Sequence, residues 1–171
     1  KMQISMYQAS VPVFVRMLTN LVAILEKAAA HADARKIDPS VLVNDRLFPD
    51  MFPLSRQVQI AADMAKAGPA RLAGLQPPSF EDTGKSFPEL IERVRRTVAF
   101  LETLQPEQID GSEERSVTWP TRGTTRTLPG LQYLLNHVSP NVYFHITTTY
   151  NILRHNGVEL GKQDFLGPIP Q

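Results

Sequence analysis

The alternation of apolar and polar positions predicts a mostly helical chain. Apolar residues recur every three or four positions in four long segments, which is the spacing of one buried helix face. These segments are residues 10–34, 54–73, 86–105 and 139–155. The stripe of the first segment consists of Val11, Phe14, Val15, Leu18, Leu21, Val22, Leu25, Ala28, Ala29 and Ala32. Four such stripes predict four helices that bury their apolar faces together.

Local signals mark where these helices begin and end. Ser10 is expected to cap the first helix, and Ser86 with Glu89 forms the S-x-x-E pattern of a capping box. Pro106 is expected to stop the third helix, since proline cannot continue a helical hydrogen-bond ladder. Gly68-Pro69 is expected to kink or break the second helix for the same reason.

The last long helix has a start and a stop signal of its own. Ser139 and Pro140 have the residue types of an N-cap and a first helical position, and Asn156-Gly157 matches a C-terminal stop. Its predicted inward face is mostly apolar and carries one imidazole. The face consists of Val138, Val142, His145, Ile146, Thr149, Ile152 and Leu153.

The connections are irregular and each has a predicted role. Residues 47–53 (LFPDMFP) cannot form a regular helix and are expected to pack over one end of the helices. Residues 115–128 favour a short β-hairpin, which is marginal alone and should lie on the helices through Trp119. Residues 129–137 are expected to form a short helical piece, and the tail is expected to dock through Phe165 and Leu166.

Composition limits the function classes. A length of 171 residues suits one domain spanning 1–171, and a formal net charge of +1 argues against nucleic acid or an anionic membrane as a partner. No apolar run approaches the ~20 residues of a membrane helix. The absence of cysteine excludes disulfides and thiolate chemistry, and a cytoplasmic location is the default expectation. Arg93, Arg95 and Arg96 are interpreted as a solvated helix face.

Two polar residues interrupt the predicted inward faces. Gln57 lies on the second helix and His145 on the last, so the simplest interpretation is a buried histidine that is hydrogen-bonded by Gln57 or a tyrosine. Asn141 and Thr149 each lie four residues from His145, and Tyr150 adds a hydroxyl near this face. These are the candidate ligand-binding residues. As metal ligands, however, neutral amides and hydroxyls are poor partners for zinc-like ions.

Several short motifs together resemble a known family. They are residues 10–14, 52–54, 57–59, 63–66, 143–157, 161–162 and 164–167. These strings resemble one bacterial family of domains of unknown function, which is similar to the DinB/YfiT-like superfamily, and the match runs over nearly the whole chain. The resemblance implies an all-α, DinB-like four-helix bundle, here with a short β-hairpin before the last helix, and often a homodimer.

The resemblance also implies a site between the second and last helices. DinB-like proteins typically hold a divalent metal with one histidine on the second helix and an H-x-x-x-H pair on the fourth, and some are thiol-dependent transferases or hydrolases. Gln57, His145 and Thr149 occupy these positions here. One hypothesis is therefore a degenerate metal-dependent enzyme that uses zinc or nickel, with His145 as ligand or general base. The alternative is a non-catalytic small-molecule-binding or dimeric interaction module without a metal.

Overall fold

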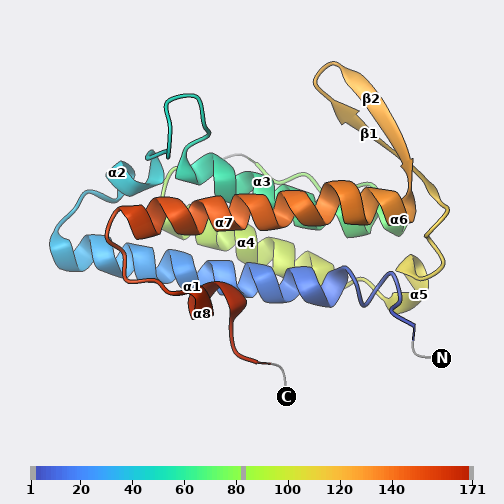
Figure 1. Cartoon of the computed structure of the whole chain (residues 1–171), viewed down its shortest axis with the longest axis horizontal. Coiled ribbons are helices and arrows are strands. Elements are labelled where there is room, and N and C mark those ends of the chain that lie inside the picture. The colour runs from blue at the N-terminus through green and yellow to red at the C-terminus, as the bar shows by residue number, and fades with distance from the viewer. Residues whose placement is uncertain (1–2, 82–83, 170–171) are drawn as a thin grey trace.

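The structure, a computed structural model, describes residues 3–81 and 84–169 and is mostly helical with one small antiparallel sheet (Figure 1). Its elements are α1 (Val11–Arg35), α2 (Pro39–Val43), α3 (Leu54–Leu72), α4 (Phe87–Glu102), α5 (Pro106–Ile109), β1 (Ser116–Thr121), β2 (Thr124–Pro129), α6 (Gly130–Tyr133), the π-helical turn η1 (Leu134–Val138), α7 (Ser139–His155) and α8 (Lys162–Leu166). The long helices therefore fall where the apolar stripes predict them.

The long helices pack side by side along most of their length. α1 lies against α4, and α3 lies between α4 and α7 (Figure 1). Their predicted stripes form one apolar cluster, which includes Phe14, Leu21, Val58, Val94 and Ile146. Within the described residues, none of the helices combines the length and apolar character needed to cross a membrane.

The predicted N-cap at Ser86 is confirmed, whereas Glu89 folds back onto the residue before the cap and not onto the backbone of Ser86 itself. The Ser86 hydroxyl accepts the backbone N–H of Glu89 at 3.4 Å, and the Glu89 carboxylate accepts the backbone N–H of Lys85 at 2.8 Å. Ser10 precedes α1 as predicted, but its hydroxyl does not cap the helix. It donates instead to the carbonyl of Met6 at 2.7 Å, because residues 6–10 already form a turn that leads into α1.

The predicted break at Gly68-Pro69 is wrong, because α3 continues to Leu72. Only three residues follow Pro69 in the helix, so the proline interrupts the ladder near its end rather than in its middle. Gly68 has no side chain where α3 packs against η1. A Cβ atom at this position would lie 2.5 Å from Cγ1 of the buried Val138. The missing side chain lets α3 approach η1 closely, and this packing holds the proline-containing turn in place. Pro106 does not stop α4, which already ends at Glu102, and it begins the short helix α5 instead.

Ser139 and Pro140 do not start a separate helix, which corrects that prediction. The chain is already helical from Gly130, and the π-helical turn η1 leads directly into α7. Pro140 would clash with the carbonyl four residues before it in a regular helix, and the wider π turn relieves this conflict. The side-chain amide of Asn141 donates to the carbonyl of His137 at 2.6 Å. This bond satisfies a carbonyl beside the irregular turn.

The predicted β-hairpin is confirmed, and so is its anchor. Arg122 and Gly123 form its two-residue turn with φ values of 34° and 81°, as a type I′ turn requires. Trp119 is 4% exposed, and its ring centroid lies 4.7 Å from both Tyr133 and His137. Through Trp119 the hairpin therefore packs against α6 and η1, at the end of the molecule opposite α2 (Figure 1).

The prediction of a solvated arginine face holds for only part of that run. Arg93 is buried and donates to the Asp63 carboxylate of α3 at 2.8 Å. Arg95 is exposed and pairs with Glu26 of α1 at 2.6 Å, and Arg96 lies at the surface. The position of Arg93 follows from a partner thirty residues away, which helix periodicity does not report.

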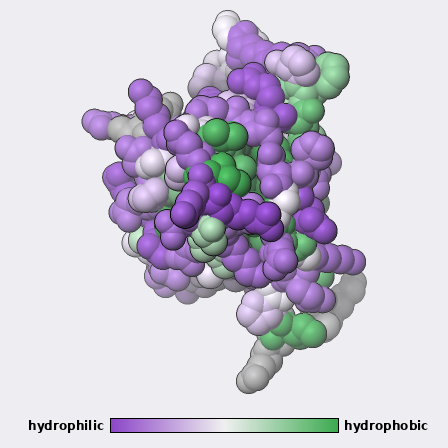
Figure 2. Space-filling view, turned by 90° about the vertical axis from the view of Figure 1, so that its left-hand side faces the viewer, coloured by the Kyte–Doolittle hydropathy of each residue, from purple (hydrophilic) through white to green (hydrophobic). Residues whose placement is uncertain are grey.

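The segment 47–53 does not pack down over the helix ends as expected. Phe48 is 63% exposed and Phe52 is 52% exposed, because Pro49 and Pro53 hold the segment in an irregular loop between α2 and α3. Figure 2 views the α2 end of the molecule and shows apolar surface set among hydrophilic side chains. The apolar residues of this loop are therefore available at the surface.

The C-terminal segment docks on α1, mainly through polar contacts. Arg16 donates to the carbonyl of Leu166 at 2.7 Å, and Asn20 donates to the carbonyl of Phe165 at 3.0 Å. Phe165 is half-buried as predicted, whereas the Leu166 side chain is exposed. Hydrogen bonds to the backbone of α8 hold the tail in addition to the predicted contact of Phe165.

Candidate functional site

Gln57 and His145 meet between α3 and α7. Nδ1 of His145 lies 2.6 Å from Oε1 of Gln57, and both residues are buried in the described structure. The interpretation of His145 as a histidine paired with Gln57 is confirmed by this hydrogen bond. Each residue reaches the contact because it replaces one apolar position in the inward stripe of its own helix.

The Gln57 amide also determines which imidazole nitrogen carries the proton. Nε2 of Gln57 donates to the carbonyl of Phe52 at 3.1 Å, so the atom that faces His145 is the carbonyl oxygen Oε1. An oxygen can only accept, and Nδ1 of His145 must therefore be the protonated nitrogen. Nε2 then carries a lone pair, has no hydrogen-bond partner among the described residues and remains in contact with solvent.

The electrostatic surroundings keep this imidazole neutral. Burial lowers the pKa of His145 below its ordinary value, and the positive charge of Arg56 lowers the pKa further. At neutral pH the side chain is therefore a hydrogen-bond acceptor and proton acceptor at Nε2. A histidine held in one tautomer by a fixed partner has the arrangement that acid–base sites use.

Aromatic rings form the rim of this site. The Phe144 ring meets the His145 ring edge-on, with a centroid distance of 5.1 Å, and is 56% exposed. Phe52, whose carbonyl binds Gln57, presents its ring 6.0 Å from the guanidinium of Arg56. Phe52 and Phe144 lie in motifs that carry the family resemblance, but neither they nor Arg56 was predicted as a site residue. The signal was available in part, since Phe144 precedes His145 and Phe52 lies in the proline-rich loop.

The other predicted site residues do not converge on His145. The Thr149 hydroxyl donates to the backbone carbonyl of His145 at 2.9 Å, and the side-chain amide of Asn141 donates to the backbone carbonyl of His137. The Tyr150 hydroxyl lies 3.5 Å from the carbonyl of Leu160, near the C-terminal segment. The structure therefore brings together only Gln57 and His145 from the predicted set.

The donor set does not fit the three-ligand metal site that the resemblance implies. Gln57 points its oxygen at His145 rather than at a shared point in space, and the Thr149 hydroxyl is turned toward the backbone. In residues 3–81 and 84–169, no group of three or more histidine, aspartate or glutamate side chains is placed to hold an ion. Neutral amide and hydroxyl groups do not replace the missing histidines for zinc-like ions.

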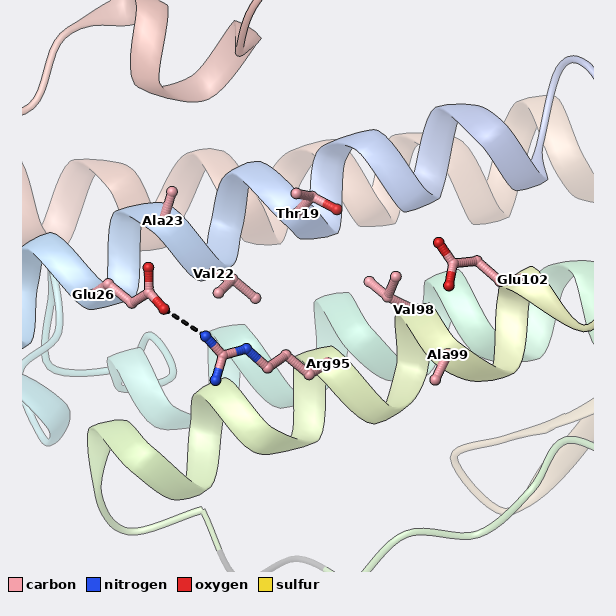
Figure 3. A pocket seen from close by; sticks show the side chains of 8 residues that line it. All are labelled: Thr19, Val22, Ala23, Glu26, Arg95, Val98, Ala99 and Glu102. Atoms are coloured by element: carbon pink, nitrogen blue, oxygen red, sulfur yellow. Dashed lines mark hydrogen bonds and ion pairs between the residues drawn. The ribbon is translucent and has the colours of Figure 1, made fainter.

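An apolar hollow lies elsewhere, between α1 and α4 (Figure 3). It has a volume of about 410 Å³ and is floored by Val22, Ala23, Val98 and Ala99. The Glu26–Arg95 ion pair spans one end of the groove. Small apolar side chains between exposed, mutually paired charges are typical of an ordinary helix–helix groove, and no reactive group lies in it.

His137 does not share the site of His145. It packs against Trp119 and lies 5.6 Å from the Tyr133 ring centroid, at the base of the hairpin. Burial lowers the pKa of His137, and the charges of Arg71 and Arg126 lower it further. His145 on α7 and His137 on η1 therefore lie in two separate environments.

Comparison with known proteins supports the family assignment. The model of a domain of unknown function, DUF1993, matches residues 6–166. The crystal structure of a DinB family member protein from Shewanella denitrificans is 42% identical in sequence, with a TM-score of 0.90, and the match covers 96% of this chain and 93% of that one. No match was found among curated proteins. The chain belongs to the DUF1993 family of DinB-like domains of unknown function.

Proposed function

We propose that this chain is a metal-independent DinB-like four-helix bundle whose His145 accepts a hydrogen bond or a proton from a small organic ligand. One observation carries the proposal: Gln57 holds Nδ1 of His145 as a donor, which directs the lone pair of Nε2 toward solvent. The four-helix layout is supported by the packing of α1, α3, α4 and α7 and by the similarity to the DinB family structure.

The surroundings of His145 favour a particular ligand chemistry. The exposed ring of Phe144 meets the imidazole edge-on, and the ring of Phe52, whose carbonyl binds Gln57, is also exposed, so an aromatic body would gain contact area there. Nε2 of a neutral imidazole accepts a hydrogen bond, so a ligand needs a donor such as a hydroxyl group to bind there. The ligand class is therefore a small aromatic or allylic alcohol, enol or phenol, which Nε2 binds and, when the hydroxyl is acidic enough, deprotonates.

Phenol is a suitable first probe because it combines one ring with one acidic hydroxyl. We expect saturable phenol binding in ligand-observed NMR on the full chain, and its loss in His145→Ala. Thr149→Val is the matched control, since it changes a buried side chain one turn away that faces the backbone. Equal binding to wild type and His145→Ala would contradict the proposal.

A chemical probe tests the state of Nε2 directly. Diethyl pyrocarbonate acylates unprotonated imidazole nitrogens, and peptide mass spectrometry locates the product. At about pH 6, where a histidine in an unstructured peptide is largely protonated, His145 should lose less reactivity than a histidine in such a peptide because its pKa is lowered. A His145 that is inert in the folded chain would show that Nε2 is closed to ligands.

Metal independence has its own test. Elemental mass spectrometry on untagged protein, for wild type and His145→Ala, should find no divalent metal near one equivalent in either. Near-stoichiometric zinc or nickel in wild type that is lost in His145→Ala would overturn metal independence.

A second candidate, an interaction module, is favoured by the exposed aromatic residues. Phe48, Phe52 and Phe144 are each more than half exposed, and apolar rings at the surface are typical of protein contacts. In this case the chain forms a homodimer, and Phe52→Ser should shift the mass measured by light scattering toward the monomer. Phenol binding that persists in a monomeric Phe48→Ser variant, whose ring is not part of the rim, would separate the two functions.

A further inference from the structure

A second cleft lies at the hairpin end of the molecule, away from His145. It has a volume of about 280 Å³ and lies between the end of α3, the following loop and strand β1. Its lining consists of Arg71, Leu75, Gln76, Pro77, Ser116, Val117, Thr118 and Pro120. Arg71 lies fourteen residues after Gln57 on α3, which is about 21 Å at 1.5 Å per residue, so the cleft and the His145 site are separate.

Arg71 places a guanidinium group in this cleft without a carboxylate partner. Its Nη1 donates to the hydroxyl of the fully buried Tyr133 at 3.0 Å, which fixes the position of the side chain. No ion pair involves Arg71 in residues 3–81 and 84–169. A guanidinium carries five N–H donors, so most of them are directed to the cleft and to solvent rather than to protein.

Strand β1 adds backbone donors along the same cleft. Thr121 and Thr124 flank the two-residue turn and form a hydrogen-bonded pair, and such pairs alternate along an antiparallel ladder. The N–H and C=O groups of Ser116 and Thr118 therefore point away from β2. They belong to the strand edge that lines the cleft, and no other backbone hydrogen bond uses them among the described residues.

Several arginine residues lie at this end of the molecule. Arg115 is anchored to the carbonyl of Leu72 beside it, and Arg122 and Arg126 lie on the hairpin. Burial lowers the pKa of the neighbouring His137, and the charges of Arg71 and Arg126 lower it further, so both guanidinium groups act on this end of the molecule. A helix end alone does not explain this arrangement, since arginine at the C-terminus of α3 needs neither a cleft nor free strand donors.

We propose that this cleft binds a small organic carboxylate, held by the guanidinium of Arg71 and the backbone N–H of Thr118. The planar fork of a guanidinium matches the two oxygens of a carboxylate. The edge N–H supplies an additional donor in a direction set by the hairpin, and Gln76 offers a side-chain amide at the rim.

Succinate is the probe, and inorganic phosphate is the comparison anion. We expect saturable shifts of the Thr118 and Gln76 amide signals in ¹H–¹⁵N spectra of the full chain when succinate is added. Arg71→Gln should weaken binding roughly tenfold or more, because a charged hydrogen-bonded pair is lost. Arg122→Gln, at the exposed turn of the same hairpin, is the matched control and should change affinity less than about twofold.

Two further arms distinguish the binding role of Arg71 from a structural one. Tyr133→Phe removes the hydrogen bond that positions Arg71 but keeps the guanidinium, so succinate binding should persist with at most a modest loss. Equal loss in Tyr133→Phe and Arg71→Gln, or equal weakening by Arg122→Gln, would overturn the assignment. Phosphate that binds as tightly as succinate would overturn the choice of a carboxylate, and a lack of saturation would overturn the site itself.

Discussion

Replacing Gln57 with leucine tests whether this side chain controls the state of His145. The substitution keeps a similar volume but removes the oxygen that lies 2.6 Å from Nδ1 of His145 and the donor to the Phe52 carbonyl. An unpaired buried polar group costs roughly 1–3 kcal/mol. For a chain of this length each kcal/mol corresponds to about 2–4 °C in Tm, so the loss is readily measured by thermal denaturation.

The imidazole tautomer gives a sharper readout than stability. Long-range ¹H–¹⁵N correlation spectra should show the Nδ1–H tautomer of His145 in wild type and a mixture with Nε2–H in Gln57→Leu. The reactivity of His145 toward diethyl pyrocarbonate should fall in parallel, since the lone pair then no longer resides on Nε2 alone. A wild-type spectrum dominated by Nε2–H would refute the assigned orientation of the Gln57 amide and the proposed function with it.

Gln57→Glu extends this test through the sign of a pKa change. A carboxylate beside Nδ1–H favours the imidazolium by about 1 kcal/mol over a neutral acceptor, which raises the pKa of His145 by roughly 0.7. In wild type the pKa of His145 is lowered by burial and by Arg56. Below the ordinary histidine pKa of about 6.5 the unfolded chain therefore binds protons more readily, and stability falls as pH decreases. Gln57→Glu should reduce or reverse this slope, as measured by urea denaturation between about pH 7 and pH 5.

Three other substitutions probe the fold and the site. Gly68→Ala should destabilise by about 1–3 kcal/mol through overpacking against Val138, and Val138→Ala in the same chain should recover part of the loss in a double-mutant cycle. Trp119→Ala should cost about 3–5 kcal/mol and release the hairpin, seen as loss of amide-exchange protection in β1; unchanged protection would refute its role as anchor. Thr149→Val should cost no more than about 1.5 kcal/mol and leave the titration of His145 unchanged, whereas a shifted titration would place its hydroxyl in the site.

The sequence was most informative where structure depends on near neighbours. The stripe from Val11 to Ala32 predicts α1, and the pairing of Ser86 with Glu89 predicts the start of α4. The hairpin and its Trp119 anchor follow from β-forming residues around a turn. Each of these features is determined by side chains a few positions apart, so periodicity and turn chemistry report them.

The prediction was less accurate where distant residues compensate for a local preference. Proline disfavours the helix at position 69, but the close packing of Gly68 against Val138 keeps the end of α3 helical. Pro140 likewise needs the π-helical turn before it, and no pattern in the sequence indicates that turn. Arg93 looked solvated because its partner, Asp63, belongs to another helix.

The candidate site shows the same division. The polar interruption of two apolar stripes was enough to pair Gln57 with His145, since buried polar groups on facing helices satisfy each other. Helix spacing also grouped Asn141, Thr149 and Tyr150 with His145, but their side chains are used by local backbone carbonyls or lie near the tail. Residue spacing predicts which side chains share a face and does not predict which hydrogen bonds they make.

Gln57 is the residue that separates acid–base chemistry from metal chemistry in this fold. A histidine at this position adds a nitrogen ligand, whereas glutamine adds an oxygen that is already committed to Nδ1–H of His145. The same hydrogen bond that weakens the case for a metal fixes the tautomer that makes Nε2 a proton acceptor. Gln57→His is then informative in its own right: a variant that gains zinc while losing the Nδ1–H tautomer would show that one side chain on α3 selects the chemistry of the site.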